Sequence, residues 1–439
     1  MASPPADPAA SREFAAAVVA RLRAAGHETY WAGGCVRDEL LGRTPADYDV
    51  ATAATPDVVR QIFGRKRTLA IGAAFGVITV LGPKGAGQVE VATFRTDAAY
   101  TDGRHPAGVS FCSAREDAKR RDFTINGLFL DPLSGEVHDF VGGRADLAAG
   151  IVRAIGVPAQ RFGEDHLRML RAIRFTAFFD FVLDGETRAA IERMAHLVAA
   201  VSPERIAAEL RAMVERTGRQ RALLLLAETG LAREVLPELA PAHGDGSDHW
   251  AIGAAVVAAL DEPSLPQAVA VLASDLDAAA ATRIARQLRL SNHETKAIAW
   301  LHAAVGELGK DTHLASRPWS QVQPWVAELG KATHLASRPW SQVQPWVADP
   351  RAPLLADLLR ARAAHGLGDA AAAAWFTAQV ARPRAEIDPP PLVTGSDLLA
   401  AGVPAGPAMG QALAKARQLQ LDGVITTKEA ALAAVRPEP

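Results

Sequence analysis

The stretch YWAGGCVRDELLGRTPADYDVAT, residues 30–52, decides how the N-terminal part of this chain folds. Its hydrophobic residues and its turn residues predict a strand over 28–31, a turn at Gly33 and Gly34, and a helix over 36–41. Glycine brings no side chain to the start of that helix, so backbone N–H groups there can approach an anionic ligand. The sequence therefore predicts a phosphate-binding turn at this point.

Two aspartates follow this turn, on a second strand predicted over residues 48–51. Asp47 and Asp49 are two positions apart, so their carboxylates project from the same face and can together hold Mg²⁺. An isolated Asp-x-Asp is also common in turns that bind no metal. The glycine pair, thirteen positions earlier, and Arg37 on the intervening helix make the combination far more specific than either part alone.

Length and composition indicate several compact units and no membrane span. The 439 residues suffice for about two to four units, and strand-like runs fade after residue 150, which predicts a mixed α+β domain followed by helices. A net charge of −2 gives no global cationic field, so binding of nucleic acid would depend on local patches. Two cysteines and no apolar run of ~20 residues predict a cytoplasmic protein without disulfides. Residues 1–10 are predicted to be a disordered tail.

A third acidic residue lies in a later strand. Residues 76–81 and 88–94 have the pattern of two strands joined by a turn. Glu90 falls between Val89 and Val91, so its side chain faces away from theirs. This indicates a metal or polar-cleft position, and the alternative is a surface glutamate on an edge strand.

Polar and basic residues follow these strands. Residues 95–121 are rich in glycine and charge and predict a mobile loop, whose conspicuous side chains are Asp97, Asp102, Arg104 and His105. Residues 119–126, KRRDFTIN, place two arginines beside an aspartate and an asparagine. Guanidinium groups can bind a triphosphate and the carboxylate can bind ribose hydroxyls, whereas a solvated cationic face is the alternative.

Residues 161–175, RFGEDHLRMLRAIRF, have the periodicity of a helix. Asp165 and Arg168 are predicted to share one face, where a carboxylate beside a guanidinium can read the Watson–Crick edge of cytosine or adenine. The alternative is an intrahelical salt bridge worth ~0.2–0.5 kcal/mol. A further helix within residues 201–210, VSPERIAAEL, is predicted to brace this base-reading helix.

A tandem duplication occupies residues 307–327 and 328–348, whose sequences differ only at Asp311 and Ala332. Two near-identical copies indicate a recent duplication rather than a solenoid, which needs three or more units. The tryptophans of the two copies are predicted to be packing anchors between helices or part of an extruded insertion, with stacking on RNA as the alternative.

Together these motifs resemble those of the bacterial-type (class II) CCA-adding tRNA nucleotidyltransferases and the related bacterial poly(A) polymerases. The resemblance is carried by residues 30–52, VEVATFR, RRDFTIN and GEDHLR, and it extends to about residue 209. It implies an α+β fold in which a small mixed-sheet nucleotidyltransferase head precedes an all-helical neck, body and tail. The implied boundaries are 11–150 for the head, 151–240 for the neck, 241–385 for the body with the duplication, and 386–439 for a tRNA-binding tail.

The resemblance also implies a role for individual residues. Catalysis is implied for Asp47, Asp49 and Glu90, with metal binding by the two aspartates. The residues implied to bind nucleotide are Gly33, Gly34, Arg37, Arg121, Asp122, Asn126, Glu164, Asp165, Arg168, Arg171 and Arg174. Lys415 and Arg417 in the tail are implied to contact tRNA.

The implied activity is template-independent addition of CCA to tRNA 3′ ends from CTP and ATP, with release of pyrophosphate. The implied mechanism is a two-metal, in-line nucleotidyl transfer with Mg²⁺ as cofactor. The alternatives are a poly(A) polymerase, an enzyme that adds only CC or only A, and a noncatalytic relative that binds tRNA. The intact pair of Asp47 and Asp49 argues against the noncatalytic alternative.

Overall fold

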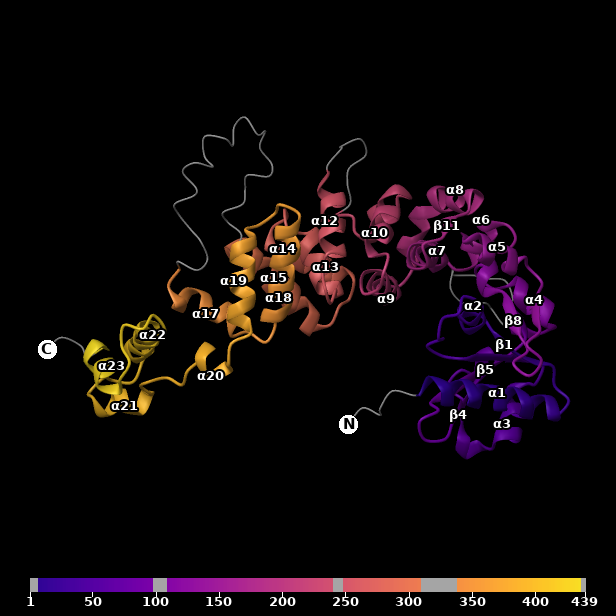
Figure 1. Ribbon diagram of the computed structural model, residues 1–439, viewed down its shortest axis with the longest axis horizontal. Coiled ribbons are helices and arrows are strands. Elements are labelled where there is room, and N and C mark those ends of the chain that lie inside the picture. The colour runs from indigo at the N-terminus through magenta and orange to yellow at the C-terminus, as the bar shows by residue number, and fades with distance from the viewer. Residues whose placement is uncertain (1–6, 98–108, 240–247, 309–337, 436–439) are drawn as a thin grey trace. The chain divides into compact units, whose positions relative to one another are not determined.

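The chain divides into two compact units, Met1–Ala242 and His243–Pro439. The computed structural model describes residues 7–97, 109–239, 248–308 and 338–435 (Figure 1). Asp102, Arg104, His105 and the first copy of the duplication beyond Leu308 lie outside these ranges. Among the described residues, no helix is long and apolar enough to cross a membrane.

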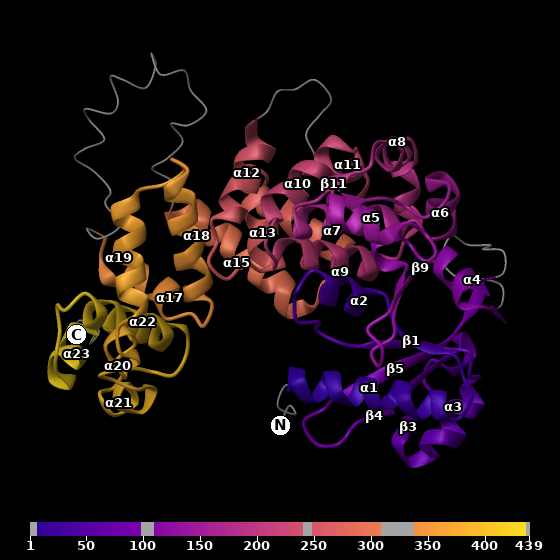
Figure 2. The same cartoon turned by 45° about the vertical axis from the view of Figure 1, so that its right-hand side comes forward.

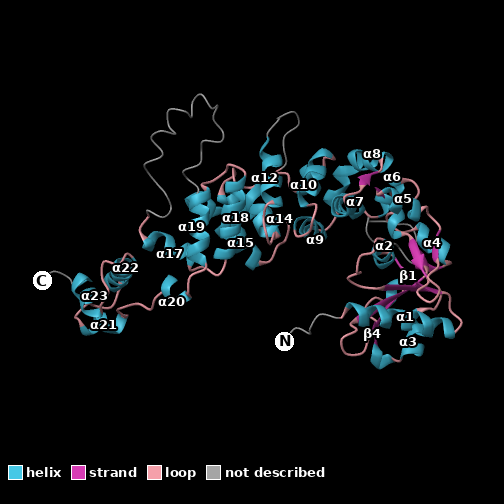
Figure 3. Ribbon diagram, in the orientation of Figure 1, coloured by secondary structure: helices cyan, strands magenta, loops and turns pink. Residues whose placement is uncertain are grey.

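All described strands belong to the first unit (Figure 3). They are β1 (Thr29–Ala32), β2 (Asp49–Thr52), β3 (Thr68–Leu69), β4 (Val77–Leu81), β5 (Gln88–Thr93), β6 (Arg95–Asp97), β7 (Val109–Phe111), β8 (Leu128–Leu130), β9 (Val137–Asp139), β10 (Ile151–Val152) and β11 (Val182–Leu183). The α-helices of this unit are α1 (Pro8–Ala24), α2 (Gly34–Leu40), α3 (Pro56–Phe63), α4 (Ala114–Lys119), α5 (Gly143–Ala149), α6 (Pro158–Glu164), α7 (Leu167–Phe179), α8 (Gly185–Met194), α9 (Pro203–Val214), α10 (Arg219–Glu228) and α11 (Leu231–Val235).

Seven strands form one mixed sheet in the order β3-β4-β5-β2-β1-β8-β9. Strands β2 and β5 run parallel, and every other neighbouring pair in this sheet is antiparallel. The predicted mixed sheet is therefore confirmed, and the four predicted strands correspond to β1, β2, β4 and β5. Helices α1 and α3 lie together against the sheet in two views (Figure 2).

The two faces of the sheet have different coverings. Trp31 and Val50 are partners across β1 and β2, and Arg12 of α1 stacks over the Trp31 ring, so this face is the one that α1 covers. Ala51 lies on the opposite face, in a buried cluster with Phe129 and with residues of α4. Because side chains alternate along a strand, Asp49 shares the face of Ala51. The catalytic candidates therefore lie beside α4 rather than beside α1.

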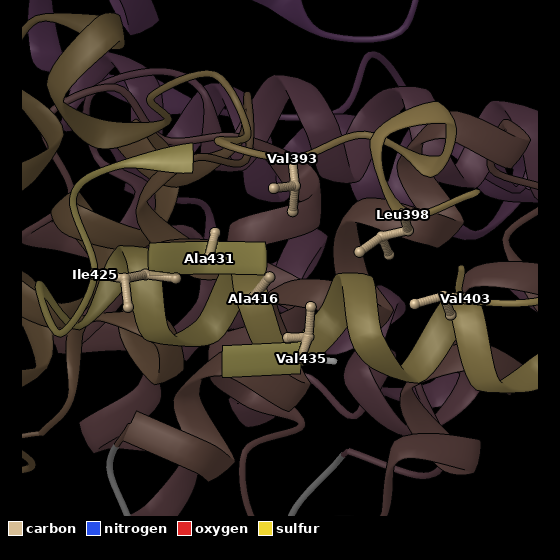
Figure 4. Close-up of a cluster of buried hydrophobic side chains, with 7 residues drawn as sticks. All are labelled: Val393, Leu398, Val403, Ala416, Ile425, Ala431 and Val435. Atoms are coloured by element: carbon tan, nitrogen blue, oxygen red, sulfur yellow. The ribbon is translucent and has the colours of Figure 1, made fainter. Parts of the chain in front are cut away.

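The second unit is helical throughout the residues that the structure describes. Its helices are α12 (Asp248–Ala258), α13 (Leu265–Leu272), α14 (Ala278–Gln287), α15 (Asn292–Leu308), α17 (Trp340–Val347), α18 (Ala352–Ala364), α19 (Ala370–Val380), α20 (Arg384–Ile387), α21 (Gly395–Ala400), α22 (Pro407–Leu421) and α23 (Lys428–Val435). The last three helices enclose a small apolar cluster (Figure 4), made of Val393, Leu398, Val403, Ala416, Ile425, Ala431 and Val435.

The second copy of the duplication supplies α17, and its tryptophans pack against other aromatic rings. Trp340 lies 6.4 Å from Trp375 and Trp346 lies 5.5 Å from Trp300, measured between ring centroids. The predicted role as packing anchors is confirmed for this copy. Trp319 and Trp325 of the first copy lie outside the described residues.

Several local predictions differ from the structure. Residues 8–10 are not part of a disordered tail, because Asp7 caps α1 through a 3.0 Å bond from the Ala9 amide. Residues 95–121 are not one mobile loop, since they contain the β6–β7 pair and also α4, which begins with a capping box at Ser113 and Glu116. Two short parallel strands, β10 and β11, accompany the helices of the predicted neck.

Candidate active site

Three exposed carboxylates gather at the start of β2 and β5. Asp49 is the first residue of β2 and is the direct partner of Glu90 on β5, so both side chains project from one face. Asp47 lies just before β2, in a bend rather than in the strand as predicted. All three side chains are exposed, and within the described chain none of them forms an ion pair. We refer to Asp47, Asp49 and Glu90 as the carboxylate face.

The carboxylates of this face repel one another. Desolvation by surrounding protein, followed by repulsion from Asp47 and Glu90, raises the pKa of Asp49 to about 6, while Arg121 opposes the rise. Since Asp49 remains exposed to solvent, water screens part of this shift. A bound cation would relieve the repulsion that remains.

The same residues fit a magnesium ion that is shared with a substrate. Among the described residues, no group of three or more His, Cys, Asp or Glu side chains is arranged to hold a metal ion. Mg²⁺ typically takes one or two carboxylates, several waters and substrate phosphates rather than a complete protein cage. Asp47 and Asp49 match that smaller requirement.

The predicted phosphate turn lies next to Arg121. Gly33 is the N-cap of α2 and has φ of 77°, a conformation that favours glycine. A Cβ atom on Gly33 would lie only 2.9 Å from Nη1 of Arg121. Any side chain at Gly33 would therefore displace the guanidinium, so glycine is required for this approach. Gly34 begins α2, as the predicted turn requires.

A series of buried and half-buried polar side chains connects α2 with α7. Arg37 is buried, and it donates from Nη1 to Asn126 Oδ1 at 2.6 Å and from Nε to Asp38 at 2.9 Å. Asn126 in turn donates to Asp122 Oδ1 at 3.0 Å. Arg171 of α7 donates to Asp122 Oδ2 from both Nε and Nη2, at 2.9 and 2.7 Å.

This series of polar contacts continues into α9. Glu209 is buried and accepts from Arg174 Nε at 2.6 Å, while its other oxygen lies 3.9 Å from Arg171 Nη1. Helix α9 thus braces α7, as predicted from sequence. We call this set the buried network; its members are Arg37, Asn126, Asp122, Arg171, Glu209 and Arg174.

The buried network holds Asp122 in its charged form. Burial alone would raise the pKa of Asp122, but Arg171 and the Asn126 amide keep it well below its ordinary value. Its Oδ1 accepts from Asn126 and from the Phe123 amide, and its Oδ2 accepts twice from Arg171. The four acceptor positions of this carboxylate are therefore already used.

The predicted base-reading pair does not lie on one helix face. Asp165 is the extended residue between α6 and α7, and its Oδ1 accepts from the Leu167 amide at 3.1 Å. Such a side-chain bond to the backbone competes with helix formation, which explains the break in the predicted helix. Arg168 pairs with Glu164 at 2.6 Å, not with Asp165.

Asp165 and Arg168 nevertheless each have a fixed partner. Asp165 accepts from Arg205 of α9 at 2.8 Å. Arg168 is buried and also donates to the carbonyl oxygens of Arg161 and Arg120, at 3.0 and 3.1 Å. The second of these bonds connects the base-reading segment to the residue before Arg121.

Two family models match parts of the chain. Residues 29–153 match the family model described as the poly A polymerase head domain, and residues 180–243 match the probable RNA and SrmB- binding site of polymerase A. Over residues 29–153 the chain is therefore similar to the head domain of poly A polymerases.

A curated relative is similar to about half of the chain. The CCA-adding enzyme of Latilactobacillus sakei subsp. sakei (strain 23K) is 45% identical over 231 residues, which are 52% of this chain and 57% of that enzyme. The chain therefore spans little more than half the length of this curated relative.

Two solved structures match nearly the whole chain. The Bacillus stearothermophilus CCA-adding enzyme in complex with CTP has a TM-score of 0.74 at 26% identity and covers 97% of this chain and 96% of its own. The Thermotoga maritima CCA-adding enzyme complexed with tRNA has a TM-score of 0.63 at 18% identity, covers 96% and 94%, and shows the fold alone.

Three residues beside the family motifs were missed from the sequence. Asp117, Arg205 and Glu209 hold, in turn, Arg121, Asp165 and Arg174. Asp117 precedes Arg120 and Arg121 by three and four positions, which is a helical pairing signal. The other two lie in the segment predicted to brace the base-reading helix, but their partners are 40 and 35 residues away.

The predicted tRNA contacts lie in the second unit, on α22. Lys415 is exposed. Arg417 instead donates to Asp388 at 2.6 Å and to the Pro389 carbonyl oxygen at 2.7 Å. It therefore fastens the segment that leads into the tail cluster of Figure 4.

Proposed function

We propose that this chain adds C, C and A to tRNA 3′ ends from CTP and ATP, with release of pyrophosphate. The observation that carries the proposal is that the carboxylate face lies near Arg121, whose positive charge lowers the pKa of Asp49. Both lie within the residues that match the poly A polymerase head domain. Transfer from a nucleoside triphosphate needs an anionic site for metal next to a cationic site for phosphate. The 45% identical relative is named a CCA-adding enzyme, and this supports the same choice of reaction.

In this proposal Asp47 and Asp49 hold the Mg²⁺ of a two-metal, in-line reaction, and Glu90 keeps their surroundings anionic. Bound Mg²⁺ would lower the pKa of the tRNA 3′-hydroxyl and neutralise charge on the leaving pyrophosphate. The backbone N–H of Gly34 binds a phosphate oxygen together with Arg121, whereas the N–H of Gly33 donates to the Leu128 carbonyl oxygen at 3.3 Å.

We further propose that the segment between α6 and α7 selects the base. Glu164 and Arg205 fix the directions of Arg168 and Asp165, which are three positions apart, and a base would be read when it replaces some of the bonds that these two side chains already make. The ribose would contact Asp122 only by displacing one of the bonds in the buried network. Arg37, Arg171 and Arg174 then act mainly through that network.

The second unit is proposed to bind tRNA, with Lys415 as an exposed phosphate contact. The two cysteines are unpaired, which supports a cytoplasmic location. The competing activity is extension by A alone into a long tail, because the family model that matches the head domain is described as that of poly A polymerases.

The test is extension of a tRNA that lacks its 3′ CCA. Purified protein is incubated with Mg²⁺ and with CTP and ATP, separately and together, and the products are resolved at single-nucleotide length. Addition that stops after three nucleotides supports the proposal, and a long A tail replaces it with poly(A) polymerase. Growth by only C or only A identifies a partial enzyme. A protein that binds tRNA but extends nothing contradicts catalysis.

A further inference from the structure

Asp117 is a buried acid in α4 that the proposed reaction has not yet used. Helix α4 packs its Ala114 and Ala118 against Ala51 and Phe129, on the same sheet face as Asp49. The Asp117 side chain is only 2% exposed. A buried carboxylate needs compensating partners, and these partners indicate what it does.

The two oxygens of Asp117 bind different groups. Oδ1 accepts from Arg120 Nε at 2.9 Å and from the Arg95 amide at 3.2 Å. Oδ2 accepts from Arg121 Nε at 3.2 Å and from Arg121 Nη2 at 3.1 Å. Burial favours the neutral acid, but Arg121 and Arg120 hold the pKa of Asp117 below its ordinary value. The carboxylate therefore stays charged between two guanidinium groups.

These bonds fix the orientation of Arg121. Its Nε–Nη2 edge is occupied by Asp117, and its Cζ lies 5.0 Å from the centroid of the Phe129 ring. Only Nη1 remains on the side of the Gly33 turn, with a long 3.5 Å contact to the Asn126 carbonyl oxygen. A guanidinium held by one edge and one face can offer the remaining nitrogen in a single direction.

We propose that Asp117 is a positioning residue for the triphosphate: it holds Arg121 so that Nη1 faces the phosphate turn at Gly33. The proposal rests on the proposed function. Without Asp117, Arg121 is free to turn toward the acids of the carboxylate face, which its charge already reaches. Arg121 would then neutralise the acids that are proposed to hold metal, instead of binding phosphate.

The test compares Asp117→Asn with Glu116→Gln. Both changes remove one negative charge from α4, but among the described residues Glu116 bonds to the Ser113 cap and not to an arginine of the site. Loss of a charge-assisted hydrogen bond predicts that Asp117→Asn raises KM for CTP and for ATP by the same factor, about tenfold. Glu116→Gln should leave both values within about twofold, since a lost cap affects stability instead.

Binding without turnover provides an independent measurement. Calorimetry with CTP, and separately with pyrophosphate, should show the same tenfold weakening for Asp117→Asn in the absence of tRNA. In an Arg121→Gln background, Asp117→Asn should cause no further weakening, because the residue through which it acts is gone. Additive effects in this cycle, or equal effects of the two α4 changes, would overturn the positioning role.

Two further outcomes separate the possible failures. If Asp117→Asn does not fold, Asp117→Glu keeps the charge but moves the carboxylate by one methylene, and an unchanged KM in that variant overturns the proposal. If the ratio of KM values for CTP and ATP changes, Asp117 acts on base selection instead. A wild-type protein that extends no tRNA overturns the proposed function, whereas an active wild type with unaffected Asp117→Asn overturns only the role of Asp117.

Discussion

The carboxylate face and the buried network are built from the same types of side chain, but they have opposite electrostatics. Asp47, Asp49 and Glu90 are exposed and have no cationic partner within salt-bridge distance among the described residues. Asp122 and Glu209 are buried and each carries an arginine at hydrogen-bond distance. In the proposed function, a cation that arrives with substrate would complete the first set. The second is complete before any substrate binds, so its role is to hold α2, α7 and α9 in place.

The largest effect is expected from a change in the carboxylate face. Asp49→Asn should lower tRNA extension by about a thousandfold or more, since it removes a ligand to a metal that contributes several kcal/mol to the transition state. Single-turnover extension at saturating CTP measures the loss. Asp57→Asn, an exposed acid on α3, is the control and should remain fully active. Normal extension by Asp49→Asn would contradict the assignment of the face.

A change in the buried network should affect stability more than chemistry. Glu209→Ala leaves Arg174, whose side chain is only 13% exposed, without its partner and should lower the free energy of unfolding by about 3–5 kcal/mol. Urea unfolding followed by circular dichroism measures the difference. The exposed pair of Arg188 and Glu192 provides the matched control, because Glu192→Ala should change stability by less than ~1 kcal/mol. Equal losses of stability in the two variants would show that burial does not strengthen the dependence of the network on its ion pairs.

The pH dependence of stability should separate the two sets further. The pKa of Asp49 is higher in the folded protein, about 6, than its ordinary 3.8, so the folded state binds more protons between these values. Stability that comes from this group is therefore present at low pH and is lost as pH rises through about 6. In metal-free protein at pH 7.5, Asp49→Asn should be slightly more stable than wild type, by less than about 1 kcal/mol after solvent screening.

Thermal unfolding at pH 4 and at pH 7.5, with and without Mg²⁺, measures this difference. The advantage of Asp49→Asn should disappear at pH 4, where the wild-type acid is protonated. Mg²⁺ should stabilise the wild type at pH 7.5 and leave Asp49→Asn unchanged. If the wild type were more stable than Asp49→Asn in metal-free buffer at pH 7.5, the carboxylates of the face would not destabilise the folded protein by repulsion.

The smallest effect is expected from removing one copy of the duplication. Deleting residues 307–327 or residues 312–332 leaves a single copy, which ends in the sequence of α17 in both cases. Every described packing contact of α17 can then form, so extension activity should stay within about twofold and Tm within about 3 °C. The two deletions differ only in keeping Ala332 or Asp311, and they should behave alike. A large loss of activity would place the extra copy in substrate binding.

Much of the fold could be predicted from patterns within short segments. Alternation predicted that Glu90 faces away from Val89 and Val91, and in the structure both valines are buried while Glu90 is exposed, because the period of a strand is two and does not depend on distant residues. The break at Asp165 could not be predicted from helical periodicity. The break depends on the bond from the Leu167 amide to the Asp165 side chain, and on the ion pair of Asp165 with Arg205, which is 40 residues away.

The same limit applies to the nucleotide-binding candidates. Gly33 and Arg121 were placed together correctly by motif, and their approach is close enough to exclude a side chain at Gly33. No sequence pattern indicated that Asp122 binds Arg171 and Asn126, or that Arg37 binds Asn126, because partners in tertiary structure are not periodic. Residue type identifies a charge, whereas only the fold shows whether that charge is still available.

The buried network also restricts how this chain can evolve. Asp122 and Glu209 are each paired with Arg171. Replacing one of the three residues alone therefore leaves a charge without its partner, and the protein with that single replacement is destabilised. A lineage can leave this arrangement only by exchanging partners in close succession. Across diverging sequences these positions should therefore be substituted together, whereas the surface residues around them should vary independently.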